Sequence, residues 1–582
     1  MHDKNTPYLI FKKNLMKKFI LWTKTVLIML LVVSCQQDDL LEKNDVETSN
    51  FSQARVVATE GAIPFEVENV RQALEVVLEY YQAEKPEIAT RFSNYNVNVT
   101  HIYYKFIPQD SIQYSTLMAD EKNLDLTTDR FEYTPVERTE DPADEEIPVF
   151  YSIVEAGYRI PAVPYEIIAE LHFTNEDELE DIPANYDEVE FKQNLMYEAR
   201  KRVGDLDEEE LAEGYMDLRQ GFEEDVPPPP GLFGKKWRPS GTILVEDDWL
   251  SEKKGSQVKL PVYRVEVNVL KWGWLRVENG STNHNGYFST GTTYTKKVHY
   301  NVKFTDFYKV IVRPGNFFAI ANWKSGSHKR QSLNVTFVKN TKHQFYALIN
   351  NAAWDYFNRV VPTYGIYNPT TIEISGHYNS DKSNYWFGWV PFRSEVKIGG
   401  KHSDGTRKRS DAIYATVIHE ITHKSHYKMD GQAFNSIAGS GAKHKLFLRE
   451  SWAVCVETVA TNDKYKQYFN QHSLGNYVAS ISYSWQINRL WKTYKQYETV
   501  GEMDEYSPAF IDLMDYNNQK TFSSSYPEDR VSGYTLSQIQ TALNGSHTIL
   551  AFGNKLKLLY NNPTEQFVDD IINYSETVID GL

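Results

Sequence analysis

The chain contains little cysteine, a deficit of basic residues and no long apolar run. Its two cysteines cannot build a disulfide framework in 582 residues. The 62 Lys and Arg residues are outnumbered by 78 Asp and Glu residues, which gives a formal net charge of −16, so a general nucleic-acid-binding surface is not expected. The most apolar stretch, Thr25 to Val33, is about half as long as the ~20 residues that a membrane-spanning helix needs. Hydrophobic residues nevertheless form 41% of the sequence, which excludes wholesale disorder and is enough for several globular domains.

The N-terminus has the three parts of an export signal. Four lysines between residues 12 and 18 precede the short apolar run, which ends in Val32-Val33-Ser34-Cys35. This pattern resembles a bacterial lipoprotein signal, which implies cleavage before Cys35 and acylation of its thiol. An uncleaved anchor or a plain secretory signal is the alternative. We therefore expect a signal peptide in residues 1–34, a tether in residues 35–56, and a mature chain that is lipid-anchored at a bacterial outer membrane, facing the periplasm or the cell surface.

Residues 57–136 are predicted to form a small α+β domain. Apolar residues at helical spacing predict a helix over Val67 to Glu84. β-branched and aromatic residues around Val97–Val99 and Ile102–Tyr104, bounded by turn residues, predict strands.

Residues 137–230 are expected to be an acidic connector. The stretch from Glu137 to Asp225 contains 28 acidic and 7 basic residues, a balance that is typical of a solvated surface or a partly disordered segment. An acidic binding site is the alternative. Pro227 to Pro230 form a semi-rigid polyproline spacer that marks the next boundary.

Residues 231–333 are predicted to form a β-sandwich module. Apolar residues alternate with polar ones from Val265 to Val269 and again from Val298 to Phe304, which predicts half-buried strands. Asn279-Gly280 and Asn285-Gly286 supply the residue types that hairpin turns need. The segment Asn283 to Phe288 resembles the D-x-x-G-x-F segment of transthyretin-like and carboxypeptidase-regulatory modules, which implies a spacing or binding role.

Residues 334–582 are predicted to form a mainly helical domain with a small sheet. A few strands are expected between Thr370 and Gly399. A few strands together with many helices are typical of an α+β domain, so the whole chain is expected to be a multidomain α+β protein. The expected helices are Gln344–Val360, Ser410–Lys428, Lys445–Thr461, Val478–Tyr497, Pro508–Tyr516, Leu536–Leu543 and Thr564–Tyr574.

The segment His419-Glu420-Ile421-Thr422-His423 is the strongest candidate for chemistry, and it lies in a helix that Ser410 can cap. Residues i and i+4 of a helix share one face and lie about 6 Å apart along its axis, so two imidazoles can converge on one ion. Zinc suits such a site because it takes nitrogen and oxygen donors, and a catalytic zinc keeps three protein ligands and one position for water. Glu420 is placed to take a proton from that water.

Glu450 is the candidate third ligand. It follows His423 by 27 positions, which leaves room for a loop and a returning helix. Glu457 is a rival ligand, or it orients a ligating imidazole through the free N–H of the ring. His426 returns to the helix face of His419 but lies about 10.5 Å away along the axis, too far to share one ion. We therefore expect His426 to support a ligand or to line the cleft.

The segment from His419 to Glu457 resembles the gluzincin metallopeptidases, in which H-E-x-x-H precedes a helix that carries a glutamate ligand. In the aminopeptidase-N branch that helix reads N-E-G-F-A-x-x-x-E. Here Arg449-Glu450-Ser451-Trp452-Ala453, followed by Glu457, keeps the glutamates and the alanine in register. Arg449 and Ser451 replace the Asn and Gly of that branch, so its aminopeptidase specificity is not implied.

This resemblance implies a zinc metallopeptidase with a zincin-like domain and a peptide or protein substrate. It implies that His419, His423 and Glu450 bind one Zn²⁺ and that Glu420 is the general base. The lipidated N-terminus, the β module and the helical H-E-x-x-H domain together resemble zinc-dependent lipoproteins of Bacteroidota. The alternative function is a non-catalytic surface-binding lipoprotein whose zinc site is structural or degenerate.

Overall fold

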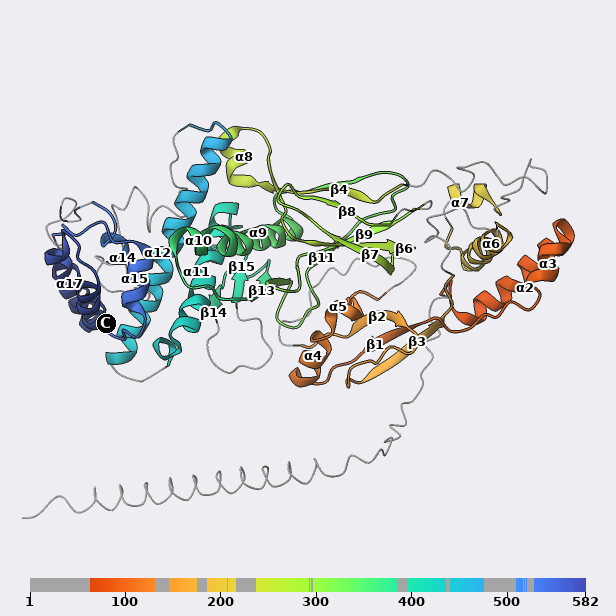
Figure 1. Ribbon diagram of the computed structural model, residues 1–582, viewed down its shortest axis with the longest axis horizontal. Coiled ribbons are helices and arrows are strands. Elements are labelled where there is room, and N and C mark those ends of the chain that lie inside the picture. Colours follow the sequence, from red (N-terminus) through yellow and green to blue (C-terminus); the bar gives the residue numbers. More distant parts are fainter. Residues whose placement is uncertain are drawn as a thin grey trace, which may run out of the picture. The chain divides into compact units, whose positions relative to one another are not determined.

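All residues described in the computed structural model belong to the unit Val56–Leu582 (Figure 1). The predicted signal peptide, Cys35, the tether, the polyproline spacer and the helix Val478–Tyr497 lie outside the described residues. None of the helices in the described residues has the length and apolarity needed to cross a bilayer. The structure describes residues 63–130, 146–174, 186–206, 208–215, 237–292, 294, 297–385, 396–435, 440–475, 509–516, 518, 520 and 528–581.

The N-terminal part combines helices with a three-stranded antiparallel sheet of order β2-β1-β3. Helix α2 spans Val67–Glu84, as predicted, because its apolar residues recur on one buried face. Strand β1 contains the predicted strand Ile102–Tyr104, whereas residues 97–99 are irregular and that strand prediction is wrong. Val97 is buried without a ladder partner. The elements are α2, α3 (Pro86–Phe92), β1 (His101–Phe106), α4 (Ser111–Met118), α5 (Glu121–Leu124), β2 (Phe150–Glu155), β3 (Tyr165–Leu171), α6 (Tyr186–Arg202) and α7 (Glu208–Glu213).

The acidic stretch that was expected to be a connector supplies two of these three strands. β2 and β3 flank β1, and α6 packs against α2. Acidic residues dominate the composition of this stretch, but in the two strands they occupy the less buried positions, such as Glu155 and Glu166. Phe150 of β2 and Leu171 of β3 are fully buried. The described parts of residues 137–230 are therefore folded onto the N-terminal sheet.

Two further four-stranded sheets share one buried apolar core. One has the order β11-β9-β6-β7. The other has the order β12-β4-β5, with β8 also pairing with β4. Their elements are β4 (Ser240–Asp247), α8 (Asp248–Lys254), β5 (Val258–Pro261), β6 (Glu266–Lys271), β7 (Leu275–Ser281), β8 (Tyr287–Ser289), β9 (His299–Lys303), β11 (Asn322–Lys324) and β12 (Leu333–Phe337).

Strands β6 and β9 are buried on both faces, not half-buried as predicted. Val267 packs in the shared core, and its neighbour Asn268 on the opposite face is also fully buried. Asn268 donates to Asp125 of the N-terminal part over 3.1 Å, and Lys303 forms an ion pair of 2.5 Å with the same carboxylate. A polar strand face therefore became buried by contact with a segment distant in sequence.

The two predicted turns have different outcomes. Gly286 has φ +73°, and its Asn283 neighbour accepts backbone hydrogen bonds, so Asn285-Gly286 does form a turn. Gly280 lies inside β7, so the prediction of a turn at Asn279-Gly280 is wrong.

The C-terminal part is a mixed sheet covered by helices. Its order is β10-β13-β15-β14, with β14 antiparallel to β15 and the other pairs parallel. The first strand, β10, comes from the region assigned to the β module, so that module does not end cleanly at residue 333. The strands are β10 (Val310–Arg313), β13 (Ile372–His377), β14 (Asn384–Tyr385) and β15 (Val396–Gly399).

Most helices predicted for this part are observed, with two differences. The predicted helix Lys445–Thr461 extends over Ser440–Gln471, and of the predicted helix Pro508–Tyr516 the described residues are helical only over Ala509–Asp512. The helix Gln344–Val360 is observed with a π-helical turn at its end, and Leu536–Leu543 agrees at both ends. Helix α16 was not predicted. The elements are α9 (Lys342–Asp355), the π-helical turn η2 (Tyr356–Val360), α10 (Val361–Tyr364), α11 (Ser410–Met429), η3 (Gly431–Phe434), α12 (Ser440–Gln471), α14 (Ala509–Asp512), α15 (Leu536–Leu543), α16 (Ile549–Leu559), η6 (Glu565–Phe567) and α17 (Val568–Gly581).

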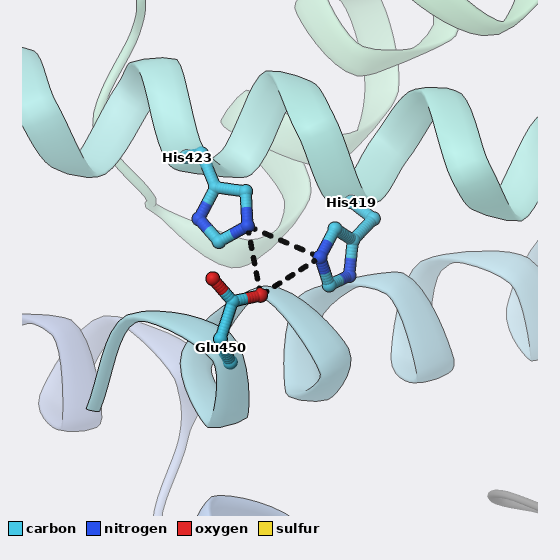
Figure 2. A group of neighbouring side chains, drawn as sticks. All are labelled: His419, His423 and Glu450. Carbon is cyan, nitrogen blue, oxygen red and sulfur yellow. Dashed lines mark hydrogen bonds and ion pairs between the residues drawn. The ribbon is translucent and has the colours of Figure 1, made fainter. Parts of the chain in front are cut away.

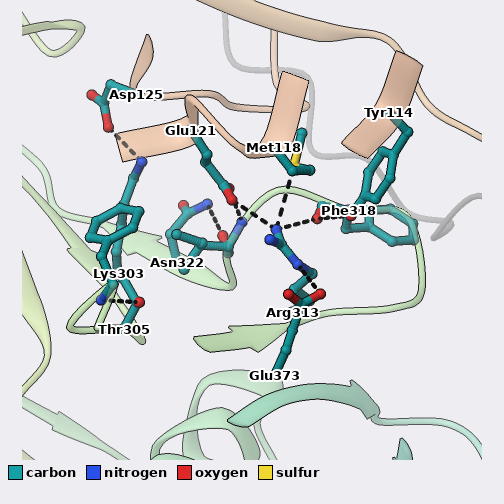
Figure 3. Close-up of polar contacts among 12 residues, drawn as sticks. Tyr114, Met118, Glu121, Asp125, Lys303, Thr305, Arg313, Phe318, Asn322 and Glu373 are labelled. Carbon is teal, nitrogen blue, oxygen red and sulfur yellow. Dashed lines mark hydrogen bonds and ion pairs between the residues drawn. The ribbon is translucent and has the colours of Figure 1, made fainter. Parts of the chain in front are cut away.

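Arg313, at the end of β10, connects this sheet to the N-terminal part (Figure 3). Its Nη1 donates to Glu121 Oε2 and to the Phe318 carbonyl, each over 2.9 Å. Its Nε donates to Glu373 Oε1 over 2.8 Å, and Glu121 Oε1 accepts from Ile320 N. Arg313 and Glu121 are each 3% exposed, so their charges are compensated by one another and by these hydrogen bonds.

Candidate metal centre

Helix α11 carries the H-E-x-x-H segment and is buried over most of its surface. It packs on α12, on α9 and on the strands β14 and β15. The sequence suggested that the Ser410 side chain caps this helix, but it does not. Its hydroxyl donates to Asp247 over 2.5 Å, and its backbone N–H donates to Asp248 over 2.9 Å. Two carboxylates at a helix N-terminus complement the helix dipole, and they hold the start of α11 against α8.

Three side chains from α11 and α12 converge on one point (Figure 2). The Nε2 atoms of His419 and His423 are 3.1 Å apart. Glu450 Oε2 lies 3.4 Å from His419 Nε2 and 3.2 Å from His423 Nε2. The structure therefore brings together the three residues that the sequence analysis nominated as ligands, and these could hold a metal ion.

The dimensions of this triangle suit an ion the size of zinc. The three distances define a point about 1.9 Å from each atom, so an ion slightly outside their plane would lie at the ~2.0–2.1 Å of zinc–nitrogen and zinc–oxygen bonds. Ligand atoms of a tetrahedral zinc at that bond length are about 3.3 Å apart, which agrees with the observed spacing. Two imidazole nitrogens and one carboxylate oxygen are also a donor set that zinc accepts.

Glu457 contacts His419 on the side of the ring that faces away from His423 and Glu450. Its Oε2 is 2.9 Å from His419 Nδ1, and the two side chains are about one-tenth exposed. A carboxylate accepts here, so His419 donates from Nδ1, and Nε2, the nitrogen that faces His423 and Glu450, is the atom that would bind a metal once it loses its proton. Glu457 thus contacts a ring nitrogen that faces away from the convergence point, which is the orienting contact considered from the sequence.

The charged groups of the triad shift one another's pKa values. Burial opposes protonation of both histidines. For His419 the hydrogen bonds with Glu450 and Glu457 outweigh burial and raise its pKa well above the usual value, whereas burial lowers the pKa of His423. Burial also opposes ionisation of Glu450, but the two histidines outweigh it and hold the pKa of Glu450 well below its usual range.

Glu420 lies beside the triad and lines the same pocket. Burial, reinforced by the charge of Glu450, raises the pKa of Glu420 to about 8, against the opposing effect of His419. The ammonium of Lys408 is another charge that acts on Glu420. Burial lowers the pKa of Lys408, while Glu420 and Glu457 act in the opposite direction.

His426 is not in the pocket, where the sequence had suggested a lining role. It is 1% exposed, and neither ring nitrogen has a hydrogen-bond partner among the described residues. Its ring packs edge-on against Phe434, with centroids 5.2 Å apart. Burial therefore lowers the pKa of His426 to about 3. His426 lies nearly one helical turn beyond His423, and at that position its side chain lies in the core and not in the pocket.

The pocket around the triad has a volume of about 160 Å³. Sequence reasoning did not identify Tyr385, Phe434 and Arg449 as members of its wall. Tyr385 ends β14 and stacks on His423 at 6.4 Å, and Phe434 lies at the end of the short helix η3. Arg449 precedes Glu450 and could have been suspected from that position. The described lining residues are Ser383, Asn384, Tyr385, His419, Glu420, His423, Phe434, Arg449 and Glu450.

No protein-family model matches this chain, and comparisons with curated proteins and with solved structures gave no match. The function is therefore inferred from the residues of the centre.

Proposed function

We propose that this chain is a zinc-dependent metallopeptidase of the gluzincin type. The observation that carries the proposal is the convergence of His419, His423 and Glu450 at zinc-like spacing in a pocket that also contains Glu420. A purely structural zinc site would take four protein ligands. Among the described residues the group of metal-ligating side chains has three members, which leaves one position for water or substrate.

Glu420 is the general base of this mechanism. Bound zinc supplies Lewis acidity, which polarises the scissile carbonyl and lowers the pKa of water toward neutrality. The Glu420 carboxylate takes a proton from the attacking water and returns it to the departing amine. A divalent cation beside Glu420 favours its charged form and so opposes the effect of burial on its pKa.

The position of strand β14 beside the pocket supports the proposal that the substrate is a peptide. β14 is the last strand of its sheet, and among the described residues it pairs only with β15. Its residues Asn384 and Tyr385 line the pocket with the metal donors. An extended peptide can add to an edge strand by backbone hydrogen bonds, and we propose that a substrate bound along β14 would have its scissile bond beside Glu420.

The site of action follows from the N-terminal sequence. We propose that Cys35 is acylated and anchors the enzyme at a bacterial outer membrane, as its lipoprotein-like signal implies. This combination makes the chain similar to zinc-dependent lipoproteins of Bacteroidota, with peptides or proteins outside the cytoplasm as substrates.

Cleavage of a broad peptide library tests the proposed activity. Zinc-loaded wild-type protein is expected to cleave library peptides in a chelator-sensitive manner. Glu420→Gln is expected to retain zinc and to reduce the rate by at least roughly 100-fold, because it removes the base but no ligand. The matched control is Glu68→Gln, at an exposed position on α2. Zinc-loaded wild type that cleaves nothing, or Glu420→Gln that cleaves at the wild-type rate, would contradict the assignment.

A further inference from the structure

A second pocket lies where the N-terminal sheet meets the sheet of β6, β7, β9 and β11. Its volume is about 360 Å³, at the lower end of the ~300–1,000 Å³ that small-molecule sites occupy. Strands β1 and β2 contribute lining residues such as Tyr103 and Tyr151, and β9 and β11 contribute Asn301 and Lys324. None of its described lining residues belongs to the pocket of the metal centre. We propose that this second pocket is a non-catalytic binding site for a neutral saccharide, a function that does not depend on the proposed peptidase activity.

Asn301 supplies a buried polar group to this pocket. The residue lies on β9 and is 4% exposed, and its amide oxygen has no hydrogen-bond partner among the described residues. Most buried amide groups of native proteins do have a partner, because a hydrogen bond left unmade in the interior costs free energy. A ligand hydroxyl bound in the pocket would supply the partner that the folded chain does not.

Two charged side chains of the wall are also available to a ligand. The Lys324 ammonium and the Asp129 carboxylate line the pocket, and within the described part of the chain neither of them has a hydrogen bond or an ion pair. Burial lowers the pKa of the Lys324 ammonium, while Asp129 and Asp125 act in the opposite direction. The wall therefore offers a strong donor and a strong acceptor in addition to the amide.

The mixture of charges in the wall favours a neutral ligand. Asp129 and Glu155 are acidic, whereas Lys324 and Arg276 are basic. An anion would be repelled by the two carboxylates, and a cation would be repelled by the two basic side chains. A ligand without net charge avoids both penalties.

Hydroxyl groups on a compact ring match the remaining features of the pocket. Each hydroxyl both donates and accepts, so adjacent hydroxyls of a sugar can bond to the amide, the ammonium and the carboxylate. Tyr151, Tyr158 and Trp274 also line the pocket, and aromatic side chains provide apolar surface for the C–H face of a sugar ring. A purely apolar ligand would bury the three polar groups without partners.

Binding of small glycosides tests this inference. The probes are the methyl glycosides of glucose, galactose, mannose and N-acetylglucosamine, with the free amino acids glycine and alanine as zwitterionic comparisons. Their dissociation constants on the full chain are measured by saturation-transfer NMR titrations. At least one glycoside is expected to bind in the millimolar range, because a ligand with few atoms gains a limited binding free energy. Its affinity should be the same for zinc-free and zinc-loaded protein, since the pocket shares no described residue with the metal centre.

Two substitutions at exposed positions locate the bound glycoside. Asp129→Ala and Lys324→Met each remove one hydrogen-bonding group of the wall, so each should weaken binding by at least roughly fivefold. The matched control Lys259→Met removes an exposed lysine of β5 that does not line the pocket, and it should bind with wild-type affinity.

Three results would overturn the inference. They are the absence of glycoside binding to the wild type, binding of the amino acids alone, and wild-type affinity in either pocket variant. Glycoside binding that requires zinc would place the probe at the metal centre and would overturn it as well. A chain that binds the glycoside but neither binds zinc nor cleaves peptides would contradict the proposed function alone.

Discussion

Replacing Glu457 tests how the metal centre is oriented. Glu457 Oε2 lies 2.9 Å from His419 Nδ1 in a buried setting. Glutamine keeps the length of the side chain and an acceptor oxygen but loses the charge, so a charge-assisted hydrogen bond becomes a neutral one. That exchange is worth about 1–1.5 kcal/mol. Zinc affinity of Glu457→Gln is therefore expected to fall roughly tenfold. Alanine also frees the imidazole to rotate, and Glu457→Ala is expected to lose up to about 100-fold.

The assay is a competition titration of zinc between the protein and a chromophoric chelator. A matched control is Glu576→Gln, because Glu576 Oε1 lies 3.5 Å from His444 in a His–Glu contact outside the triad. This control should bind zinc with wild-type affinity. Wild-type affinity in Glu457→Ala would refute the orienting role. A complete loss of zinc in Glu457→Ala, with zinc retained in Glu450→Ala, would show that Glu457 is the ligand instead of Glu450.

Three further predictions concern stability and location. Glu121→Gln is expected to lower the free energy of unfolding by about 3 kcal/mol, because it leaves the buried Arg313 charge without its main partner. Glu373 is 34% exposed, so Glu373→Gln should lower the free energy of unfolding by less than about 1 kcal/mol. Equal losses for the two variants in chemical denaturation would contradict this prediction. Unfolding frees His426 to bind a proton below pH about 6.5, while burial holds its native pKa near 3, so native stability should decline as the pH falls through this window. His426→Leu should flatten that decline in urea titrations, and an unchanged slope would count against it. Cys35→Ser should move the protein from the membrane fraction to the soluble fraction of cells, and continued sedimentation with membranes would oppose lipid anchoring at Cys35.

Features that depend on local sequence were predicted best. The helix α2 and the segment Ser410–Lys428 of α11 have apolar residues at helical spacing, and their observed bounds agree to within a residue. The strands β2 and β3 were missed because their acidic residues dominated the composition, although pairing with β1 depends on the buried residues between them. The polar face of β6 contacts Asp125 through Asn268, and a contact with a residue so distant in the sequence leaves no signal in the strand itself.

In the candidate site, too, the features set by local sequence were predicted and those set by contacts between distant segments were not. The spacing of His419 and His423 predicts their shared face from helix geometry alone, and Glu450 was nominated by its register in a resembling motif. The positions of Tyr385 and Phe434 in the pocket wall depend on how β14 and η3 pack against α11. No local pattern encodes that packing. His426 was misjudged because helix periodicity gives the direction of a side chain but not what covers it.

Zinc content of the purified protein is the most direct measurement of the central claim. Elemental analysis after reconstitution and dialysis is expected to find one zinc per chain in the wild type and in Glu420→Gln, and none in Glu450→Ala, because only the last loses a donor atom of the triad. Absence of zinc from the wild type, or one equivalent retained in Glu450→Ala, would contradict a metal centre formed by His419, His423 and Glu450.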